Sequence, residues 1–242
     1  VGIGEWQEFR FIGKWGFIDR TGREVVPPKY DVVEDFHEGL ARVGIGKRKK
    51  SGFIGKYGFI DRAGREVVPP KYDWAWDFYE GLAAVGIGKW KKSGFIGKHG
   101  FIDQTGREVV PPKYDQAGDF HEGLAAVGIG KRKKSGFIGK YGFIDQTGRE
   151  VVPPKYDRAW DFHEGLAVVG IGKRKKSGFI GKYGFIDRTG REVVPPKYDW
   201  ASGFHEGLAR VGLNGKWGFI DRTGREVVPP KYDYAWNFQE GL

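Results

Sequence analysis

Histidine and carboxylates stand close together at several points of the chain, and such side chains can bind metal ions or move protons. One group consists of Asp35, His37 and Glu38. It recurs as Asp119, His121 and Glu122, and as Asp161, His163 and Glu164. In other copies the histidine is replaced by Tyr79 or Gln239, so the group is not kept intact. The sequence therefore predicts turns whose polar residues face water, with no catalytic residue, no metal site and no cofactor.

The composition excludes several further kinds of site and segment. The 242 residues contain no Cys, which excludes disulfides and thiolate metal sites, and no phosphate-loop or zinc motif occurs. No apolar run approaches the ~20 residues of a membrane-spanning helix, so no transmembrane segment is expected. Because the chain begins with Val1 and contains no Met, we expect a soluble domain trimmed at its N-terminus, with any signal peptide removed and the compartment unassigned.

The elements that position these residues are copies of one segment. A stretch that begins Gly-Phe-Ile-Asp and ends Val-Val-Pro-Pro-Lys-Tyr-Asp occurs six times, opening at Gly16, Gly58, Gly100, Gly142, Gly184 and Gly218. The first four steps between copies are 42 residues long and the last is 34. A fixed period of this size indicates a repeat architecture. One unit is too short to fold alone, so we expect a single repeat domain over residues 1–242.

Each copy predicts short strands, because no stretch shows the 3.6-residue apolar period of a helix. In one copy a turn is expected at residues 103–106, where Gly106 can adopt the left-handed conformation that closes a three-residue hairpin loop. Pro111 and Pro112 are expected to end a strand, because proline donates no ladder hydrogen bond. The expected elements of this copy are strands at 82–88, 95–102 and 107–110, a polar tip at 89–94, a strand or loop at 113–120 and a turn at 121–123.

The sixth copy is eight residues shorter than the others and shows what the extra residues do. It carries Asn214-Gly215, the strongest short hairpin signal. Because eight is an even number, four residues on each arm lengthen a hairpin by roughly 13 Å without turning any side chain to the other face. The other copies are therefore expected to form long hairpins.

The two chain ends fit one another in repeat phase. Residues 1–4 match the first strand of a copy, and residues 238–242 match the turn that precedes such a strand. No terminal copy carries a polar cap, which an open solenoid usually needs and a ring does not. Four strands in about 42 residues is also the size of a propeller blade. The sequence thus predicts an all-β, propeller-like closed ring of six repeats and a monomer, with an open twisted β-solenoid as the alternative.

The repeat resembles a known family. Lys14-Trp-Gly-Phe-Ile-Asp19 and its equivalent at residues 216–221, with the Pro-Pro-Lys-Tyr-Asp segment and the Phe-x-Glu-Gly-Leu-Ala turn, look like the WG (KWG) repeat of mainly bacterial proteins. The resemblance covers the whole chain. It implies a β-rich scaffold that mediates interactions and no enzyme activity, and the near-identity of the copies suggests recent amplification or a consensus-type design. The naming Trp is replaced in the middle copies by Tyr57, His99, Tyr141 and Tyr183.

Two positions vary between copies that are otherwise nearly fixed. The first holds Val32, Trp74, Gln116, Arg158, Trp200 and Tyr234 in turn. The second holds Glu34, Trp76, Gly118, Trp160, Ser202 and Trp236. Positions two residues apart share a face of an extended segment, and a buried contact between identical units would not accept such different side chains. Both positions are therefore expected to be exposed. The residues predicted to bind a partner are Trp74, Trp76, Arg158, Trp160, Trp200, Tyr234 and Trp236.

The net charge of +10 originates in the hairpin tips. Four Lys-rich runs hold fifteen of the 41 Lys and Arg residues, which leaves 26 basic against 31 acidic residues in the rest of the chain. Such runs predict polyanion binding, and the alternative is solvated loops that protect strand edges. The runs consist of Lys47, Arg48, Lys49 and Lys50; Lys89, Lys91 and Lys92; Lys131, Arg132, Lys133 and Lys134; and Lys173, Arg174, Lys175 and Lys176.

Together these features predict a non-enzymatic scaffold that presents a surface to macromolecular partners, mainly proteins. Two alternatives come from other function classes. One is salt-dependent binding of nucleic acid or another polyanion through the basic tips. The other is glycan binding on the Trp-rich segments, because aromatic rings stack on sugar rings.

Overall fold

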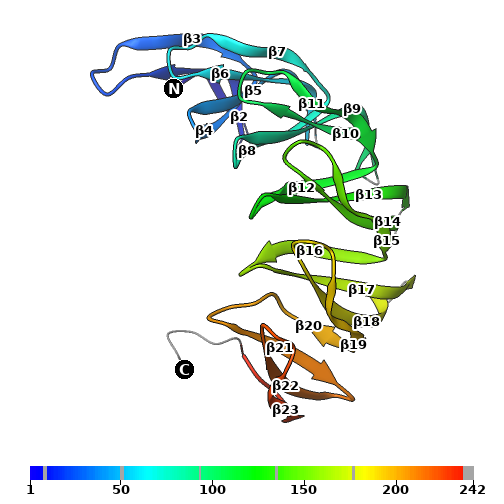
Figure 1. Cartoon of the computed structure of the whole chain (residues 1–242). Coiled ribbons are helices and arrows are strands. Elements are labelled where there is room, and N and C mark those ends of the chain that lie inside the picture. The colour runs from blue at the N-terminus through cyan, green and yellow to red at the C-terminus, as the bar shows by residue number, and fades with distance from the viewer. Residues whose placement is uncertain (8–9, 50–51, 93, 134–135, 176–177, 237–242) are drawn as a thin grey trace. The chain divides into compact units, whose positions relative to one another are not determined.

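The computed structural model describes the chain except residues 8–9, 50–51, 93, 134–135, 176–177 and 237–242. The described residues form strands and no helix, so none of them belongs to a helix that could span a membrane. Six antiparallel sheets follow the six repeats (Figure 1). The all-β prediction is confirmed. Among the described strands no sheet closes on itself, and the closed ring stays a prediction.

The chain divides into two compact units, residues 1–113 and 114–242. Numbered in chain order, sheets 1 to 3 form the first unit. Sheet 1 contains β1 (Gly2–Gln7), β2 (Arg10–Ile18) and β3 (Glu24–Tyr30). Sheet 2 contains β4 (Val32–His37), β5 (Leu40–Lys49), β6 (Gly52–Asp61) and β7 (Glu66–Tyr72). Sheet 3 contains β8 (Trp74–Tyr79), β9 (Leu82–Lys91), β10 (Gly94–Asp103) and β11 (Glu108–Tyr114).

Sheets 4 to 6 form the second unit. Sheet 4 contains β12 (Gln116–His121), β13 (Leu124–Lys133), β14 (Gly136–Asp145) and β15 (Glu150–Tyr156). Sheet 5 contains β16 (Arg158–His163), β17 (Leu166–Lys175), β18 (Gly178–Asp187) and β19 (Glu192–Tyr198). Sheet 6 contains β20 (Trp200–Ala201), β21 (Leu208–Leu213), β22 (Lys216–Asp221) and β23 (Glu226–Tyr232). In each four-stranded sheet the strands pair in chain order, so the first and last strands are the edges.

The turn predicted at residues 103–106 is confirmed. Gly106 has φ +84°, and the Asp103 N–H donates to the Arg107 carbonyl at 3.0 Å, which closes a three-residue loop. The Asp103 carboxylate accepts hydrogen bonds from the Thr105 hydroxyl and N–H and from the Arg107 N–H. The hydrogen bond from the Thr105 hydroxyl, helped by those from Arg107, lowers the pKa of Asp103 to about 2.

The strand end predicted at Pro111 and Pro112 is wrong, because β11 continues to Tyr114. The equivalent strand pairs of sheets 2 and 4 shift register at their Pro-Pro segments, so these prolines lie in a bulge of an edge strand, where no ladder donor is needed. The bulge also explains the glycine of the Trp-Gly motif. A Cβ on Gly100 would lie 2.2 Å from the Val110 carbonyl oxygen and 2.7 Å from the Pro112 nitrogen.

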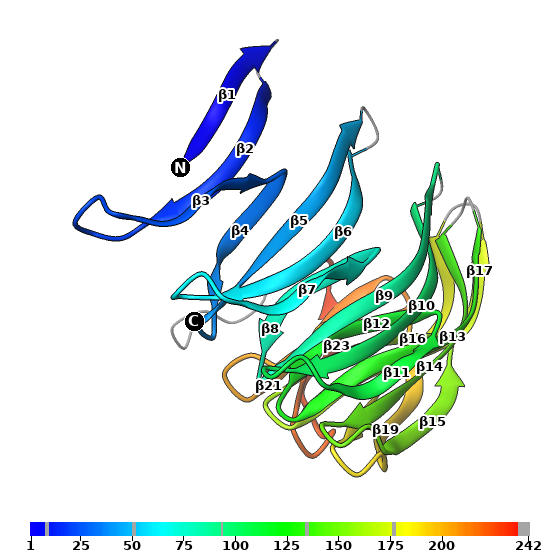
Figure 2. The same ribbon diagram turned by 90° about the horizontal axis from the view of Figure 1, so that it is seen from above.

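The predicted hairpins form in both lengths. In sheet 6, Asn214 and Gly215 both have positive φ, as a two-residue type I′ turn requires, and they join two six-residue strands. In sheet 2, β5 and β6 are ten residues long and extend past β4 and β7 as a two-stranded ribbon (Figure 2). The expected segment at 113–120 also contains a strand, β12.

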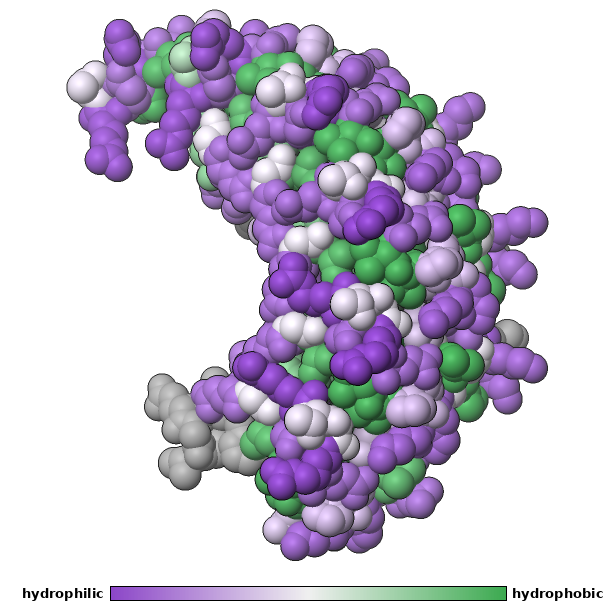
Figure 3. Space-filling model, viewed as in Figure 1, coloured by the Kyte–Doolittle hydropathy of each residue, from purple (hydrophilic) through white to green (hydrophobic). Residues whose placement is uncertain are grey.

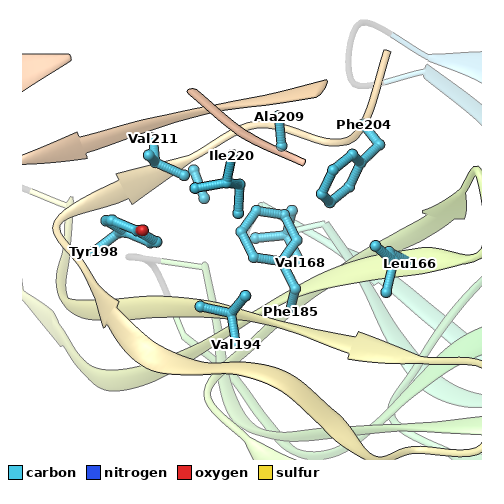
Figure 4. Close-up of a cluster of buried hydrophobic side chains, with 10 residues drawn as sticks. Leu166, Val168, Phe185, Val194, Tyr198, Phe204, Ala209, Val211 and Ile220 are labelled. Carbon is cyan, nitrogen blue, oxygen red and sulfur yellow. The ribbon is translucent and has the colours of Figure 1, made fainter. Parts of the chain in front are cut away.

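The core lies between the faces of successive sheets within each unit. Directly paired residues of antiparallel strands share a face, so each sheet has a forward face, toward the next sheet, and a backward face. Figure 4 shows the contact between sheets 5 and 6. The forward face of sheet 5 contributes Phe185, Val194 and Tyr198, and the backward face of sheet 6 contributes Ala209, Val211 and Ile220, all at most 4% exposed. Sheets 2 and 3 repeat this contact with equivalent residues.

A buried tyrosine on the forward face of a sheet donates a hydrogen bond to a glutamate of the next sheet. The Tyr114 hydroxyl donates to the Glu150 carboxylate at 3.1 Å, and burial, with the negative charge of Glu150, raises the pKa of Tyr114 to about 12. The same hydrogen bond joins Tyr30 to Glu66, Tyr72 to Glu108, Tyr156 to Glu192 and Tyr198 to Glu226. Each interface between sheets therefore carries a specific polar contact inside an apolar one.

A single aspartate links each sheet to the next. Asp157 stands between β15 and β16, and its N–H donates to the Gly170 carbonyl at 2.9 Å. One carboxylate oxygen accepts the Gly172 N–H at 2.9 Å, and the other accepts the Lys140 ammonium at 2.7 Å. Asp31, Asp73, Asp115 and Asp199 occupy the same place between other sheets. These hydrogen bonds fix the chain direction at the point where a new sheet begins.

Candidate binding surface

The carboxylates of the Asp-His-Glu groups serve the contact between repeats. Glu122 has φ +53° in a two-residue turn, an uncommon conformation for a residue with a side chain, and its carboxylate accepts the Gly165 N–H of the next repeat at 2.8 Å. Glu38 and Glu164 make the equivalent bond to Gly81 and Gly207. The expectation that this turn only faces water missed this role. The available signal was that the glutamate occurs in all six copies whereas the histidine does not.

The histidines of these groups lie near other side chains. His121 Nε2 is 3.7 Å from a carboxylate oxygen of Asp161, and the His121 and His163 rings are 5.9 Å apart. Across the described ranges, no three His, Asp or Glu side chains stand close enough to hold a metal ion. The glutamates of these groups bind backbone N–H groups of the next repeat.

In sheets 2 to 5 the two variable positions lie on the first strand, next to a β-bulge. In β8, Ala75 and Phe78 keep register with β9, while Trp76 and Asp77 between them lie opposite the single residue Ala84. Ala75 and Phe78 are almost fully buried. Two fixed residues thus anchor the strand, and the bulge leaves Trp76 45% exposed.

The prediction that both positions are exposed is correct for the second position at Glu34, Trp76, Trp160 and Trp236, and wrong for it at Gly118 and Ser202, which are half-buried. For the first position it is correct at Tyr234 alone among the six copies and wrong elsewhere, because Gln116, Arg158 and Trp200 are half-buried and the first two copies are also enclosed. Val32 is only 3% exposed, and Trp74 is half-buried. Trp74 pairs with Gly86, where no side chain separates it from Phe95, whose ring stacks at 6.2 Å. His99 contacts Trp74 edge-on at 4.7 Å. The first position therefore packs on the aromatic side chains of its own hairpin.

The exposed tryptophan of β8 rests on an arginine of the preceding sheet. The Arg42 guanidinium lies 5.6 Å from the Trp76 ring centre and donates a short hydrogen bond to the Ala75 carbonyl. It also lies 3.6 Å from the Asp77 carboxylate. The Trp74 and Trp76 rings meet edge-on at 5.5 Å. Trp76 is thus held from two sides while almost half of its surface faces solvent.

Sheets 5 and 6 carry related arrangements. In sheet 5, the Trp160 ring lies 5.4 Å from Tyr183 and is 44% exposed, and the Arg158 guanidinium lies 5.4 Å from the Phe179 ring. In sheet 6, Trp200 is half-buried against Trp217 at 5.0 Å, with the Arg210 guanidinium 4.5 Å from its ring. Tyr234 and Trp236 follow sheet 6, 5.2 Å apart, and are 61% and 74% exposed.

The basic residues of the tips are exposed wherever the structure describes their side chains. Lys50, Lys134 and Lys176 lie outside the described residues, and only the backbone is described at Arg48 and Lys49. The exposed basic side chains are Lys47, Lys89, Lys91, Lys92, Lys131, Arg132, Lys133, Lys173, Arg174 and Lys175. Beside them stand exposed isoleucines that sequence reasoning did not single out, namely Ile45, Ile54, Ile87, Ile96, Ile129, Ile138, Ile171 and Ile180. Figure 3 shows hydrophobic patches among hydrophilic side chains on the face it presents.

Two open cavities lie between successive sheets. The first, about 440 Å³, is bounded by β2 and β5 and includes the ion pair between Lys14 and Asp31 at 2.7 Å. The second, about 660 Å³, is bounded by the turns of sheets 4 and 5 and includes Arg149 and Arg188. Neither contains a residue of the variable positions.

Solved structures resemble this chain in fold alone. A eukaryotic initiation factor matches with a TM-score of 0.50 at 10% identity, over 81% of this chain and 54% of that one. The chain thus spans about half the length of that factor. A polysaccharide lyase, an ulvan lyase, matches with a TM-score of 0.33 at 12% identity, over 86% and 71% of the two chains. A mannose phosphorylase from Leishmania mexicana matches with a TM-score of 0.28 at 12% identity, over 83% and 86%. The last two scores are too low to bear on the assignment.

No curated protein sequence matches the chain. The family model described as "WG containing repeat" does match, and its matches follow the six copies. They cover residues 15–48, 57–89, 100–132, 141–174, 183–217 and 217–242. With six in-phase matches and one antiparallel sheet for each copy, the chain belongs to the WG-repeat family and is a β-repeat scaffold.

Proposed function

We propose that this scaffold binds protein partners through the first strand of its sheets, with the second variable position as the anchor. The observation that carries the proposal is the exposure of Trp76 and Trp160, at 45% and 44%, on strands that the buried Phe78 and Phe162 anchor in the core. Tryptophan anchors dominate many protein interfaces, because they bury a large area at a low cost in conformational entropy.

The contacts that hold the Trp76 ring in place favour a role in binding over exposure without a function. Arg42 and Trp74 hold the ring, so little freedom remains to be lost on binding. The bulge keeps Ala75 and Phe78 in the core whatever stands between them. Side chains at the second position can therefore change from copy to copy without disturbing the sheet.

The proposal is tested by selecting peptides from a random displayed library on the intact chain. We expect the selected peptides to lose at least about tenfold in affinity for the Trp76→Ser/Trp160→Ser variant, the effect typical of an anchor residue. Trp6→Ser is the matched control, since Trp6 is exposed but lies on a hairpin. Equal loss with both variants, or with neither, would contradict the proposal. Binding of glycans on an array, abolished by the same double substitution, would instead favour stacking on sugar rings.

The exposed basic side chains favour a second function, the binding of nucleic acid or another polyanion. The proposed residues are the Lys and Arg residues of the four Lys-rich runs, the first of which begins at Lys47 and the last of which ends at Lys176. The proposal involves no base-specific contact. Each charged contact releases counterions, so affinity should fall steeply with salt.

The test measures binding of a labelled nonspecific oligonucleotide at about 50 and 200 mM salt, a range over which several phosphate contacts lose orders of magnitude in affinity. We expect that loss in the wild type and weak binding at both salts after Lys131, Arg132, Lys133 and Lys173 are replaced by Ser. Replacing Arg107, Arg149, Arg191 and Arg225, which are exposed on the other turns, removes the same charge and serves as control. Equal effects of the two sets would indicate a response to net charge alone.

A further inference from the structure

The backward face of sheet 1 differs from every other backward face. Its isoleucine, Ile18, is 48% exposed, whereas the equivalent isoleucines of sheets 2 to 6 are fully buried. Its valine, Val1, is 51% exposed, whereas the equivalents are fully buried. Those equivalents are Ile60, Ile102, Ile144, Ile186 and Ile220, and Val43, Val85, Val127, Val169 and Val211. Glu24 stands where Glu66 accepts a tyrosine hydroxyl in sheet 2, and both glutamates are exposed.

The forward face of sheet 6 shows the complementary difference. Tyr232 is 50% exposed, whereas the equivalent tyrosines of sheets 1 to 5 are at most 1% exposed. Val227 beside it is 47% exposed, although its equivalents are half-buried. Sheet 6 thus presents the surface that every earlier forward face buries against the next sheet.

We infer that these two faces bind each other between two copies of this chain, the forward face of sheet 6 of one copy on the backward face of sheet 1 of the next. The template is the contact between sheets 5 and 6, where Tyr198 donates to Glu226 at 3.0 Å. In the contact between copies, the Tyr232 hydroxyl donates to the Glu24 carboxylate of the neighbour. Ile18 and Val1 then fill the places that Ile220 and Val211 occupy in sheet 6.

Association of this kind is heterologous, because the two faces are different. Each copy keeps one free face after binding, so assembly continues head to tail unless the rotation closes it. The monomer expected from the sequence depends on ring closure, which would cover both faces within one molecule. Because each face matches the sheet that its equivalents pack against inside the chain, and a second copy presents that same sheet, the occupant we assign is a second copy.

Cross-linking distinguishes association between copies from ring closure within one chain. Because the chain contains no Cys, only the introduced cysteines react. Glu24→Cys and Tyr232→Cys proteins are mixed and treated with a short bis-maleimide. We expect a covalent product of twice the 27.3 kDa chain mass, well above that of either variant alone. A mixture of Arg107→Cys and Tyr232→Cys is the matched control, since Arg107 is exposed on a turn of sheet 3 and belongs to neither face. A yield no greater than in this control would overturn the inference.

The double variant Glu24→Cys/Tyr232→Cys tests ring closure directly. Association between copies gives a ladder of multiples whose yield rises with protein concentration. A single internally cross-linked chain of the monomer mass, at all concentrations, would show that the two faces meet within one molecule and would overturn the inference.

A substitution on one face provides a test without cross-linking. Ile18→Asp should raise the Kd for self-association, measured by sedimentation, at least about tenfold, the effect of removing an anchor from an interface core. Ile171→Asp is the matched control, because Ile171 has the same 48% exposure on a hairpin ribbon. Both residues are exposed in the single chain, so neither change should prevent folding. Sedimentation as a monomer by the wild type at all concentrations would contradict the inference.

Discussion

The interfaces between sheets and the first strands of those sheets follow opposite rules within one repeat. The interface repeats the same tyrosine, glutamate and glycine from copy to copy, each with a specific partner. The first strand accepts valine, tryptophan, glutamine or arginine at one position and glutamate, tryptophan or glycine at another. The bulge in that strand holds the second variable position and, in β8, leaves its side chain outside the core. Under the proposed function, stability and recognition thus rest on different residues of one unit.

The largest effect is expected from a side chain added opposite the Pro-Pro bulge inside a sheet. Gly142→Ala would place a Cβ 2.2 Å from the Val152 carbonyl oxygen and 2.7 Å from the Pro154 nitrogen, so the main chain must move. We expect a loss of about 3 kcal/mol or more in the free energy of unfolding, at the upper end for overpacking, measured by urea denaturation.

Gly22→Ala is the matched control for that change. Gly22 has φ +85° with no atom near its missing Cβ, so only left-handed strain of about 1 kcal/mol is expected. Similar losses for the two variants would show that the close approach at the Pro-Pro bulge does not matter.

Alkaline pH should weaken the interfaces through their tyrosines. Burial, with the charge of Glu150, raises the pKa of Tyr114 to about 12, and burial also raises the pKa of Tyr30, Tyr72 and Tyr156. A raised folded-state pKa gives stability that is full below the unfolded value of about 10 and is lost as pH rises through the folded value. The free energy of unfolding should therefore fall from about pH 10 to pH 12. The free energy of unfolding of the Tyr114→Phe variant should fall less steeply over this pH range. An equally steep fall in the variant would argue against ionisation of the buried tyrosines as the cause.

A smaller effect is expected from one interface hydrogen bond. Tyr156→Phe removes the bond to Glu192 and leaves a carboxylate without that donor, for a loss of about 1–2 kcal/mol in thermal or urea unfolding. Tyr232→Phe, at an exposed tyrosine, should change the stability of the dilute chain by less than about 0.5 kcal/mol. Equal losses for both would mean that the buried tyrosine contributes only through its ring.

The smallest effect should come from the second variable position. Trp76→Ser/Trp160→Ser should change the free energy of unfolding by no more than about 0.5 kcal/mol per site, as surface substitutions generally do. Trp74→Ser should cost about 1–2 kcal/mol, less than for a fully buried ring, because Trp74 is half-buried against His99 and Phe95. The reverse order would show that Trp76 supports the fold and would remove the basis for the proposed binding surface.

Much of the local structure could be predicted from the sequence because it depends on residues near one another. The period predicted one sheet for each copy, Asn214-Gly215 predicted a tight hairpin, and the glycine after each aspartate predicted a three-residue loop. These signals act through φ preferences within a few residues, and the structure confirms them.

The errors have a common origin in contacts made across strands. Pro111 and Pro112 predicted a strand end, but Gly100 of β10 has no side chain, so the main chain of the two prolines can lie against β10 in a bulge. Trp74 read as exposed, but Gly86 opposite leaves room for it to reach Phe95. Glu122 read as a surface turn residue, but its partner is 43 residues away in the chain. Spacing within one copy contains none of this information.

The single aspartate between sheets has a mechanical consequence. With one residue of slack, a pulling force applied along the chain is transmitted directly to the hydrogen bonds of Asp157 and its equivalents, rather than being absorbed by a loose linker. Sheets should therefore yield one at a time under load. Each 42-residue unit should release roughly 140 Å of extended chain, and the 34-residue unit correspondingly less. The chain should then lengthen under load in discrete, nearly equal steps, one for each sheet that unfolds.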